Sequence, residues 1–408
     1  LTFSRASLAT MYDAAGTLVW CPHNLLTYSE QIDNAAWAKL GLGAGSTPVI
    51  TANAGVAPDG TTTADRVQLN CGGSTISDRS ICNQSVSGLM TGRQYTGAVY
   101  IKAYSAGEVG KQLRLFGDLL VTEAVVTLTA DWQLVQTSGT AAAASGNFGL
   151  ETRGTVTANT TADFLMWGAR LNVGPLQPYY PTTSAAYYGP RLTYDPVTHS
   201  ALGLLVEEQR TNMLTYSEAL DNAAITKSNS SVVAASATAP DGTLTGFKLR
   251  EDSTASADHR IYWTVTTTAV GHVLSVFAKA AERSWMYLRM NRSGGGTPRV
   301  WFDLANGVVG TAETGTSGAI TSVGGGWYRC SLILDTAAGA SVNPLIGITT
   351  ANGATAYSGD GSSGIYVWGA QLEAGAFATS YIPTGAASAT RAADVVTCTG
   401  AAFSSWFN

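Results

Sequence analysis

A long internal duplication constrains this 408-residue chain more than any other feature. Asn-Leu-Leu-Thr-Tyr-Ser-Glu at residues 24–30 returns as Asn-Met-Leu-Thr-Tyr-Ser-Glu at residues 212–218. Three further blocks recur in the same order: Ala-Pro-Asp-Gly-Thr at 57–61 and 239–243, Trp-Gly-Ala-x-Leu at 167–171 and 368–372, and a Tyr-Pro or Tyr-Ile-Pro corner at Tyr180 and Tyr381. Matched blocks in one order predict two copies of one module, with insertions and deletions confined to loops.

The local pattern within each copy predicts β-strands. Runs such as 95–101, 274–278, 285–290 and 327–332 are rich in aromatic and β-branched residues at a period of two, and glycine-rich turns separate them. Charged residues make up only 12% of the chain, about half the share usual in soluble proteins. We therefore expect an all-β fold of two tandem antiparallel sandwiches of the jelly-roll type. Ser29 and Ser217 are each predicted to begin a single helical turn.

These patterns predict five parts of the chain. We expect an extended attachment segment at 1–23, a first module at 24–181, an extended connector with one strand at 182–211, a second module at 212–385, and a connector or the start of a further module at 386–408. Residues 3–7 resemble 389–394, so connector-like sequence flanks both modules. The chain is expected to be an excerpt of a longer protein.

The charge pattern argues against two classes of partner. The formal net charge is −5 and no Lys/Arg run exceeds two residues, whereas nucleic-acid binding needs a dense basic footprint. No apolar run approaches the roughly 20 residues of a membrane span.

The five cysteines fit no metal or redox motif and are interpreted as reduced, although Cys71 and Cys82 lie close enough in sequence to pair.

Catalytic patterns are not found in the sequence. None of the four histidines lies in a nucleophile motif or at a metal-ligand spacing. Glu207 and Glu208 are adjacent, and neighbouring residues on a strand point to opposite faces, so they cannot flank one glycosidic bond. They are better explained as solvated charges or as a partner for Arg210. We expect a protein that is not an enzyme.

A glycan-binding site needs exposed aromatic rings to stack on sugars and polar groups to bond hydroxyls. The candidates all lie in the second module: Tyr262, Trp263, Trp285, Tyr287, Arg289, Asn291 and Arg299. Trp285, Tyr287 and Arg289 share one face of a strand, while Met286, Leu288 and Met290 share the other. The Met-Leu-Met face suits a core, which directs the first three side chains outward. The competing interpretations are burial in the core and contact with another subunit.

The repeated blocks, together with Tyr-Asp-Pro at 194–196 and Leu-Leu-Val-Glu-Glu at 204–208, resemble a module of tailed-bacteriophage and prophage virion proteins. These include tail fibres, collar or head fibres, and the head spikes of gene transfer agents. The module is similar to jelly-roll carbohydrate-binding modules. The resemblance is closer in the second copy, and residues 403–408 look like the opening of a further module. It implies a structural calcium near the first strand, with Glu30, Glu218 and Glu373 as candidate ligands.

Three functions are consistent with this reading. The first is a non-enzymatic virion fibre or spike that attaches to host surface polysaccharide. The second is a purely structural decoration or connector protein of the virion, and the third, less favoured, is a polysaccharide depolymerase. The resemblance further implies assembly in the host cytoplasm, a place on the virion surface, contacts with capsid, collar or tail proteins, and a homo-oligomer with a trimer favoured.

Overall fold

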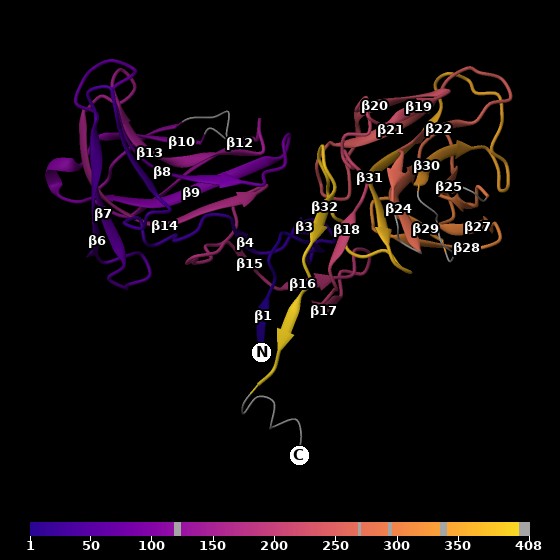
Figure 1. Cartoon of the computed structure of the whole chain (residues 1–408), viewed down its shortest axis with the longest axis horizontal. Coiled ribbons are helices and arrows are strands. Elements are labelled where there is room, and N and C mark those ends of the chain that lie inside the picture. The colour runs from indigo at the N-terminus through magenta and orange to yellow at the C-terminus, as the bar shows by residue number, and fades with distance from the viewer. Residues whose placement is uncertain (118–123, 268–270, 293–295, 335–340, 400–408) are drawn as a thin grey trace. The chain divides into compact units, whose positions relative to one another are not determined.

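The computed structural model describes residues 1–117, 124–267, 271–292, 296–334 and 341–399. The chain divides into two compact units (Figure 1). The first unit is Pro22–Gly189, and the second unit combines Leu1–Cys21 with Pro190–Asn408. In these ranges the single helical element is the short 3₁₀ turn η1 (Ala106–Glu108). The predicted all-β class is therefore confirmed.

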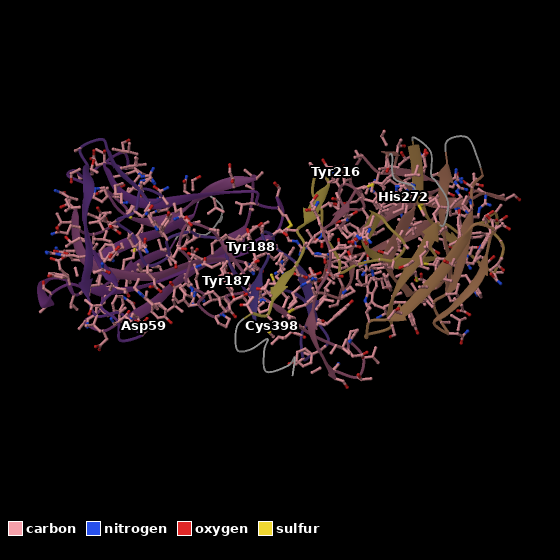
Figure 2. The ribbon with its side chains drawn as sticks, turned by 60° about the horizontal axis from the view of Figure 1, so that its bottom comes forward. Asp59, Tyr187, Tyr188, Tyr216, His272 and Cys398 are labelled. Atoms are coloured by element: carbon pink, nitrogen blue, oxygen red, sulfur yellow. The ribbon has the colours of Figure 1, made fainter. Side chains whose placement is uncertain are left out.

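The first unit is a sandwich of two antiparallel sheets. The β10 sheet contains, in spatial order, β11 (Ala124–Thr127), β10 (Gln112–Gly117), β13 (Ser145–Arg153), β8 (Arg79–Ser87) and β5 (Ala38–Leu42). The β9 sheet contains β12 (Gln133–Thr140), β9 (Gln94–Ala103), β14 (Thr161–Val173), β7 (Ala64–Asn70) and β6 (Ser46–Gly55). A short pair, β4 (His23–Asn24) with β15 (Tyr187–Tyr188, labelled in Figure 2), joins the two ends of this unit.

The second unit repeats this plan with a few additional strands. Its β25 sheet contains β19 (Thr226–Ser228), β22 (His259–Tyr262), β30 (Ser341–Thr349), β25 (Trp285–Arg292), β26 (Arg299–Asp303) and β27 (Val308–Ala312), with β23 (Val265–Thr266) also pairing β30. Its β24 sheet contains β20 (Ser230–Ala237), β21 (Gly246–Glu251), β31 (Gly364–Ala374), β24 (His272–Ala280), β29 (Trp327–Leu334) and β28 (Thr316–Ser322). Strands β27 and β28 each extend one sheet, and the remaining order matches the first sandwich. The duplicated jelly-roll-type sandwich is the predicted fold.

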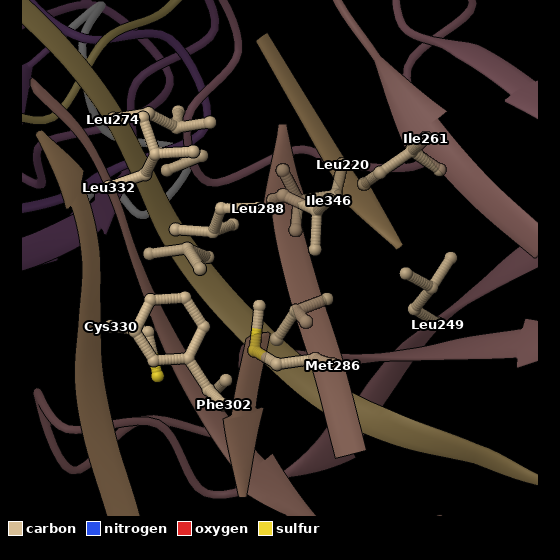
Figure 3. Packing of buried hydrophobic residues seen from close by; sticks show 14 of the residues in the cluster. Leu220, Leu249, Ile261, Leu274, Met286, Leu288, Phe302, Cys330, Leu332 and Ile346 are labelled. Carbon is tan, nitrogen blue, oxygen red and sulfur yellow. The ribbon is translucent and has the colours of Figure 1, made fainter. Parts of the chain in front are cut away.

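The core of the second sandwich lies between its two sheets (Figure 3). Met286, Leu288 and Met290 of β25 are fully buried in it. Cys330 and Leu332 of β29 meet them from the opposite sheet. The Met-Leu-Met face of β25 is thus the core face, as the alternation predicted, because successive side chains of a strand point to opposite sides.

The repeated asparagine explains two of the repeated sequence blocks. The Asn212 side chain donates to the carbonyl oxygens of Ala370 and Ile382, and its Oδ1 accepts from the amides of Leu214 and Leu372. Asn24 makes the same four bonds in the first unit, to Ala169, Tyr180, Leu26 and Leu171. One buried amide therefore ties the opening of each module to its Trp-Gly-Ala-x-Leu strand and its Tyr-x-Pro corner.

The repeated serine is a second tie, but it does not begin a helix. Ser217 Oγ bonds the Tyr381 hydroxyl at 2.8 Å and accepts from the Thr384 amide. Ser29 bonds Tyr179 and the Thr182 amide in the same way. The expected helical turn was wrong: successive four-residue turns, each closed by a bond from residue i+3 to residue i, occupy this stretch, and each serine hydroxyl bonds the far end of its module.

The Asp-Gly blocks form tight turns on the surface. Asp59 (Figure 2) and Asp241 each accept from the amide and hydroxyl of the threonine two residues later. This is the Asx-turn geometry that aspartate favours. All the repeated blocks therefore serve the internal architecture of the module.

The connector contains more strands than predicted. Residues 182–211 were expected to hold one strand, but they hold β15, β16 (Arg191–Tyr194), β17 (Ala201–Leu205) and the start of β18 (Arg210–Asn212). β16 pairs β17, and β18 pairs β32 (Ala389–Arg391). The local sequence predicted too few strands in this segment because glycine and proline interrupt its β-forming runs. Pairing with other strands nevertheless stabilises it.

The N-terminal segment is not a free extension either. β2 (Thr10–Tyr12) and β3 (Leu18–Trp20) form a hairpin, and β1 (Thr2–Ser4) pairs β33 (Val395–Thr397). These strands belong to the second unit although the segment precedes the first in sequence. The predicted extended attachment segment is therefore a set of paired strands.

A buried ion network holds these end segments together. Asp394 accepts from Arg5 at 2.7 Å and from Arg191 at 2.5 Å, and all three side chains are fully buried. Glu207 bonds Arg191 and Arg391, each at 2.7 Å. These arginines oppose the effect of burial and hold the pKa values of Asp394 and Glu207 below their usual range. The neighbouring Glu208 pairs with Arg210 at 2.5 Å.

The cysteines do not form a disulfide. All five are free, with Cys21, Cys71, Cys82 and Cys330 buried and Cys398 exposed. Burial alone raises the pKa of the Cys330 thiol, as expected for a sulfur that serves as a small apolar core group. The proposed further module at 403–408 lies outside the described residues.

Candidate functional site

The outward side of the β25 sheet gathers aromatic and arginine side chains. The strand registers place Trp301, Tyr287, Gly347 and Arg260 in one row across β26, β25, β30 and β22. They place Arg299, Arg289, Leu345 and Tyr262 in the next row. Trp285 follows on β25, opposite Asp303. We call these residues, with Asp258 before β22 and Glu313 after β27, the outer face.

The aromatic rings of the outer face differ in depth. Tyr287 is fully buried, and its ring lies over Gly347, where any side chain would overlap it. Trp301 stands 6.0 Å from Tyr287 between ring centroids and donates its indole N–H to the Ala354 carbonyl at 2.7 Å. Trp285 and Tyr262 pack against this pair but are only half-buried. The accessible rings are therefore those of Trp285 and Tyr262.

Asp258 is the polar hub of the outer face. It accepts from the Tyr287 hydroxyl at 2.8 Å, from Arg260, and from Arg289 at 3.4 Å. Burial, followed by the Asp258 charge, raises the pKa of Tyr287, so this hydroxyl is a donor at neutral pH. The shared acceptor fixes three donors in place, and fixed donors are the elements of a preorganised binding site.

The second carboxylate of the outer face is Glu313, which accepts from Arg299 at 3.1 Å. Burial lowers the pKa of Arg289, and the charges of Arg260 and Arg299 contribute in the same direction. Asp303 is hydrogen-bonded to the amide of Ala305 and the side chain of Asn306 in its own turn. The face therefore combines half-exposed rings with fixed polar donors.

The predicted candidates separate into two groups. Trp285, Tyr287, Arg289, Arg299 and Tyr262 do lie together on the outer face. Trp263 was wrong as a binding residue, because it is buried in the core and donates to the Thr215 carbonyl. It continues the alternation of β22, in which His259, Ile261 and Trp263 are buried and Arg260 and Tyr262 are not, so the period of two already placed it on the core face. The Asn291 side chain lies outside the described residues.

Sequence reasoning missed several residues of this face, among them Trp301, Arg260, Asp258 and Glu313. The alternation of Trp301 with the buried Phe302 was the available signal for its orientation. Arg260 also carried such a signal, since it alternates with the buried Ile261. No pattern in the sequence pointed to Asp258, because it precedes β22 and its role depends on contacts with β25.

The expected calcium ligands do not come together. Glu30 accepts from the Tyr179 hydroxyl in the first unit, while Glu373 is buried in the second and accepts from the amide and hydroxyl of Thr379. In the part of the chain that the structure describes, no group of three or more His, Cys, Asp or Glu side chains, Glu218 included, is arranged to hold a metal ion. The calcium site at these glutamates therefore stays a prediction.

The corresponding face of the first sandwich has different chemistry. Glu151 is buried beside Arg79 at 2.7 Å, Arg114, and Arg153 at 3.8 Å. The nearby ring, Phe116, is itself buried and lies within 5.8 Å of the Arg79 guanidinium. Among its described residues this face also has arginines but lacks half-exposed aromatic rings like Trp285 and Tyr262, so the second sandwich is the stronger candidate.

Comparisons with known proteins give only distant likenesses. No protein-family model matches the chain, and no curated protein matches it. The tandem CBM22-1-CBM22-2 domain of Paenibacillus barcinonensis Xyn10C is similar over 87% of this chain and 98% of that chain, at 12% identity and a TM-score of 0.28. The enzymatically active domain of bacteriophage CBA120 tailspike protein 4 is similar over 37% of this chain and 21% of that chain, at 10% identity and a TM-score of 0.26.

A third solved structure, the plant peptide RALF23 in complex with FER and LLG2, is similar over 75% of this chain and 89% of that chain, at 8% identity and a TM-score of 0.19. Because these similarities are low, function must be argued from the side chains of this protein. Among the described residues, no helix has the length and apolar character to cross a membrane.

Proposed function

We propose that this chain is a non-enzymatic glycan-binding protein that takes sugar on the outer face of its second sandwich. The observation that carries the proposal is the pair of half-buried rings, Trp285 and Tyr262, on either side of a fixed cluster of donors around Asp258. Sugar rings have apolar C–H faces that stack on aromatic rings, and hydroxyls that exchange hydrogen bonds with arginine and carboxylate groups.

The buried members of the face give it rigidity. Tyr287 is fixed by Gly347 beneath it and by Asp258 at its hydroxyl, and Trp301 is fixed by the Ala354 carbonyl. Their role is to hold the half-exposed rings and the arginines in one geometry before a ligand arrives. A site that is already ordered loses less entropy when it binds.

The setting that we propose is the surface of a bacteriophage-type virion, with host surface polysaccharide as the ligand. The sequence blocks shared with virion fibres and spikes support this setting, as do the tandem sandwiches. In this proposal the chain assembles in the host cytoplasm as a homo-oligomer, with a trimer favoured, and contacts capsid, collar or tail proteins. Imaging a virion with this chain labelled would locate it, and absence from the particle would contradict the setting.

The test of glycan binding uses the full chain and purified bacterial surface polysaccharides. We expect saturable binding, followed by calorimetry or by quenching of tryptophan fluorescence. Trp285→Ala should weaken binding by up to about tenfold, because one stacked aromatic ring contributes on the order of 0.5–1.5 kcal/mol. Tyr104→Ala is the matched control, because this exposed ring lies in the first unit. Loss of binding in both variants, or in neither, would contradict the proposed site.

A purely structural virion protein is the second candidate. The β16–β17 hairpin favours it, because Leu192, Leu202 and Leu204 are exposed there and β17 pairs only with β16 among the described strands. An open edge with apolar side chains is suited to contact with another chain. This alternative predicts stable oligomers and no polysaccharide binding. A depolymerase would instead release reducing ends from the polysaccharide, and we expect none.

A further inference from the structure

We infer that the outer face selects acidic glycans, and that Arg289, with Arg260 and Arg299, recognises an anionic substituent on the sugar. This inference rests on the proposed function, because it specifies the ligand class of the same site. Arginine is the side chain best suited to such a group, since its planar fork bonds a carboxylate or sulfate through two parallel N–H groups.

The concentration of arginine on this face is the first argument. The whole chain has 23 lysines and arginines in 408 residues, yet three arginines stand on three strands of one sheet side. Arg289 and Arg299 are direct cross-strand neighbours. Like charges in that position destabilise a sheet. The fold gains nothing from this pairing, so a ligand is the better explanation for it.

The incomplete pairing of Arg289 is the second argument. Its nearest carboxylate, Asp258, stands at 3.4 Å and already accepts from Arg260 and from the Tyr287 hydroxyl. Arg289 is 92% buried, and its Nε–H has no hydrogen-bond partner. Arg260 and Arg299 also have buried Nε–H groups without partners. The Nε–H groups of Arg170, Arg191, Arg210, Arg329 and Arg391 share this feature, so it is the grouping of Arg260, Arg289 and Arg299 on one face of one sheet that points to a missing acceptor.

The charge balance is the third argument. Three guanidinium groups are paired with only two carboxylates, Asp258 and Glu313, so the two rows of arginines have a local positive excess although Asp303 balances the charge of the face as a whole. The remaining carboxylate of the face, Asp303, lies opposite Trp285, four residues along β25 from Arg289, and is bonded within its own turn. An anion beside Arg289 would balance the excess and supply the missing acceptor.

The geometry also places the rest of the sugar. Tyr262 lies in the row of Arg289 and Arg299, and Trp285 lies beyond the row of Tyr287 on the same face. A ring that stacks on either aromatic residue can direct a substituent toward the arginines. The ligand class is therefore a polysaccharide that carries carboxylate or sulfate groups, with uronic acids as the simplest example.

The experiment compares three polymers with the full chain: a polyuronate, the same polymer after chemical reduction of its carboxyl groups, and a sulfated polymer of similar charge density. We expect the polyuronate to bind at least about tenfold more tightly than its reduced form, because hydrogen bonds to charged groups contribute about 1.5–3 kcal/mol. Binding should weaken as salt is raised. Binding of the sulfated polymer alone would also support anion recognition and would identify sulfate as the group.

The variants are Arg289→Gln and Arg299→Gln, with Arg250→Gln as the matched control. Arg250 is exposed on β21 of the opposite sheet. We expect the first two to abolish the preference for the acidic polymer and the control to keep it. Arg299 is partly exposed, so its variant tests the inference even if Arg289→Gln unfolds, which thermal melting would reveal.

The outcomes separate the inference from the proposed function. Equal binding of acidic and reduced polymers, still sensitive to Trp285→Ala, would overturn the inference and leave glycan binding in place. A preference for acidic polymer that survives both arginine variants would also overturn it. A chain that binds none of the polymers would contradict both.

Discussion

Arg289 on β25 lies directly opposite Arg299 on β26, with both side chains on the side of the sheet away from the core. The backbones of two paired strands hold these positive charges in adjacent positions. A local arrangement that opposes stability is expected where function requires it. The two sides of β25 therefore have different roles. Met286, Leu288 and Met290 pack in the core, and Arg289 lies on the outer face.

Stability of the arginine pair is the first prediction. Arg299→Gln should leave the free energy of unfolding within about 0.5 kcal/mol of the wild type or raise it slightly, because it removes a like-charge neighbour of Arg289. Urea denaturation measures this directly. As a contrast, Arg283→Gln should destabilise, because Arg283 bonds the buried Glu251 through two contacts. A large loss of stability in Arg299→Gln would show that the pair supports the fold.

The two tryptophans Trp263 and Trp285, which lie on opposite sides of the β25 sheet, should behave in opposite ways. Trp263→Ala should cost about 3–5 kcal/mol of stability, because it empties a core position. Trp285→Ala should cost much less stability and should reduce glycan binding. Chemical denaturation and a binding assay on both variants test the distinction. Similar stability losses in the two variants would place Trp285 in a supporting role.

The repeated asparagine should be essential to each module. Asn212→Ala removes four hydrogen bonds from buried backbone groups, so we expect a loss of about 2–4 kcal/mol. Asn306→Ala is the matched control, since this exposed amide bonds Asp303 at the surface, and should cost less than about 1 kcal/mol. Calorimetry of both variants provides the comparison. If both changes had equal effects, the proposed tie would be refuted.

The buried ion network predicts a dependence on pH. The pKa of Asp394 is held below its unfolded value of about 4, so its contribution to stability is complete above that pH and is lost as pH falls through the lower folded value. Asp394→Asn should destabilise by about 3–5 kcal/mol at pH 7, because it removes the buried carboxylate that pairs with Arg5 and leaves Arg191 with Glu207 alone.

The measurement for this variant is thermal melting across a pH series. The difference between Asp394→Asn and the wild type should shrink as pH falls below about 4. Asp221→Asn, at an exposed position, should show little difference from the wild type at any pH. A difference that stayed constant down to pH 2 would show that the Asp394 charge is not the cause.

Much of the fold was predictable because its signals are local or repeated. The alternation of β25 identified its core face, since a strand has a period of two wherever it is placed. The period of two does not predict how deeply each side chain on a face is buried. Tyr287 and Trp285 lie on one face with the same alternation, but Gly347 and the cluster around Asp258 bury Tyr287 and leave Trp285 half-exposed.

The repeated sequence blocks were enough to predict two copies of one β-sandwich, because residues such as Asn24 and Asn212 recur in the same order in each copy. The folded chain was needed to show that Leu1–Cys21 belongs with the second unit and that Asp258 joins Arg260, Arg289 and Tyr287. The two kinds of feature differ in how far along the chain their causes act. Strand periodicity and turn chemistry act over a few residues, whereas burial and charge pairing depend on segments that meet only after the sheets have formed.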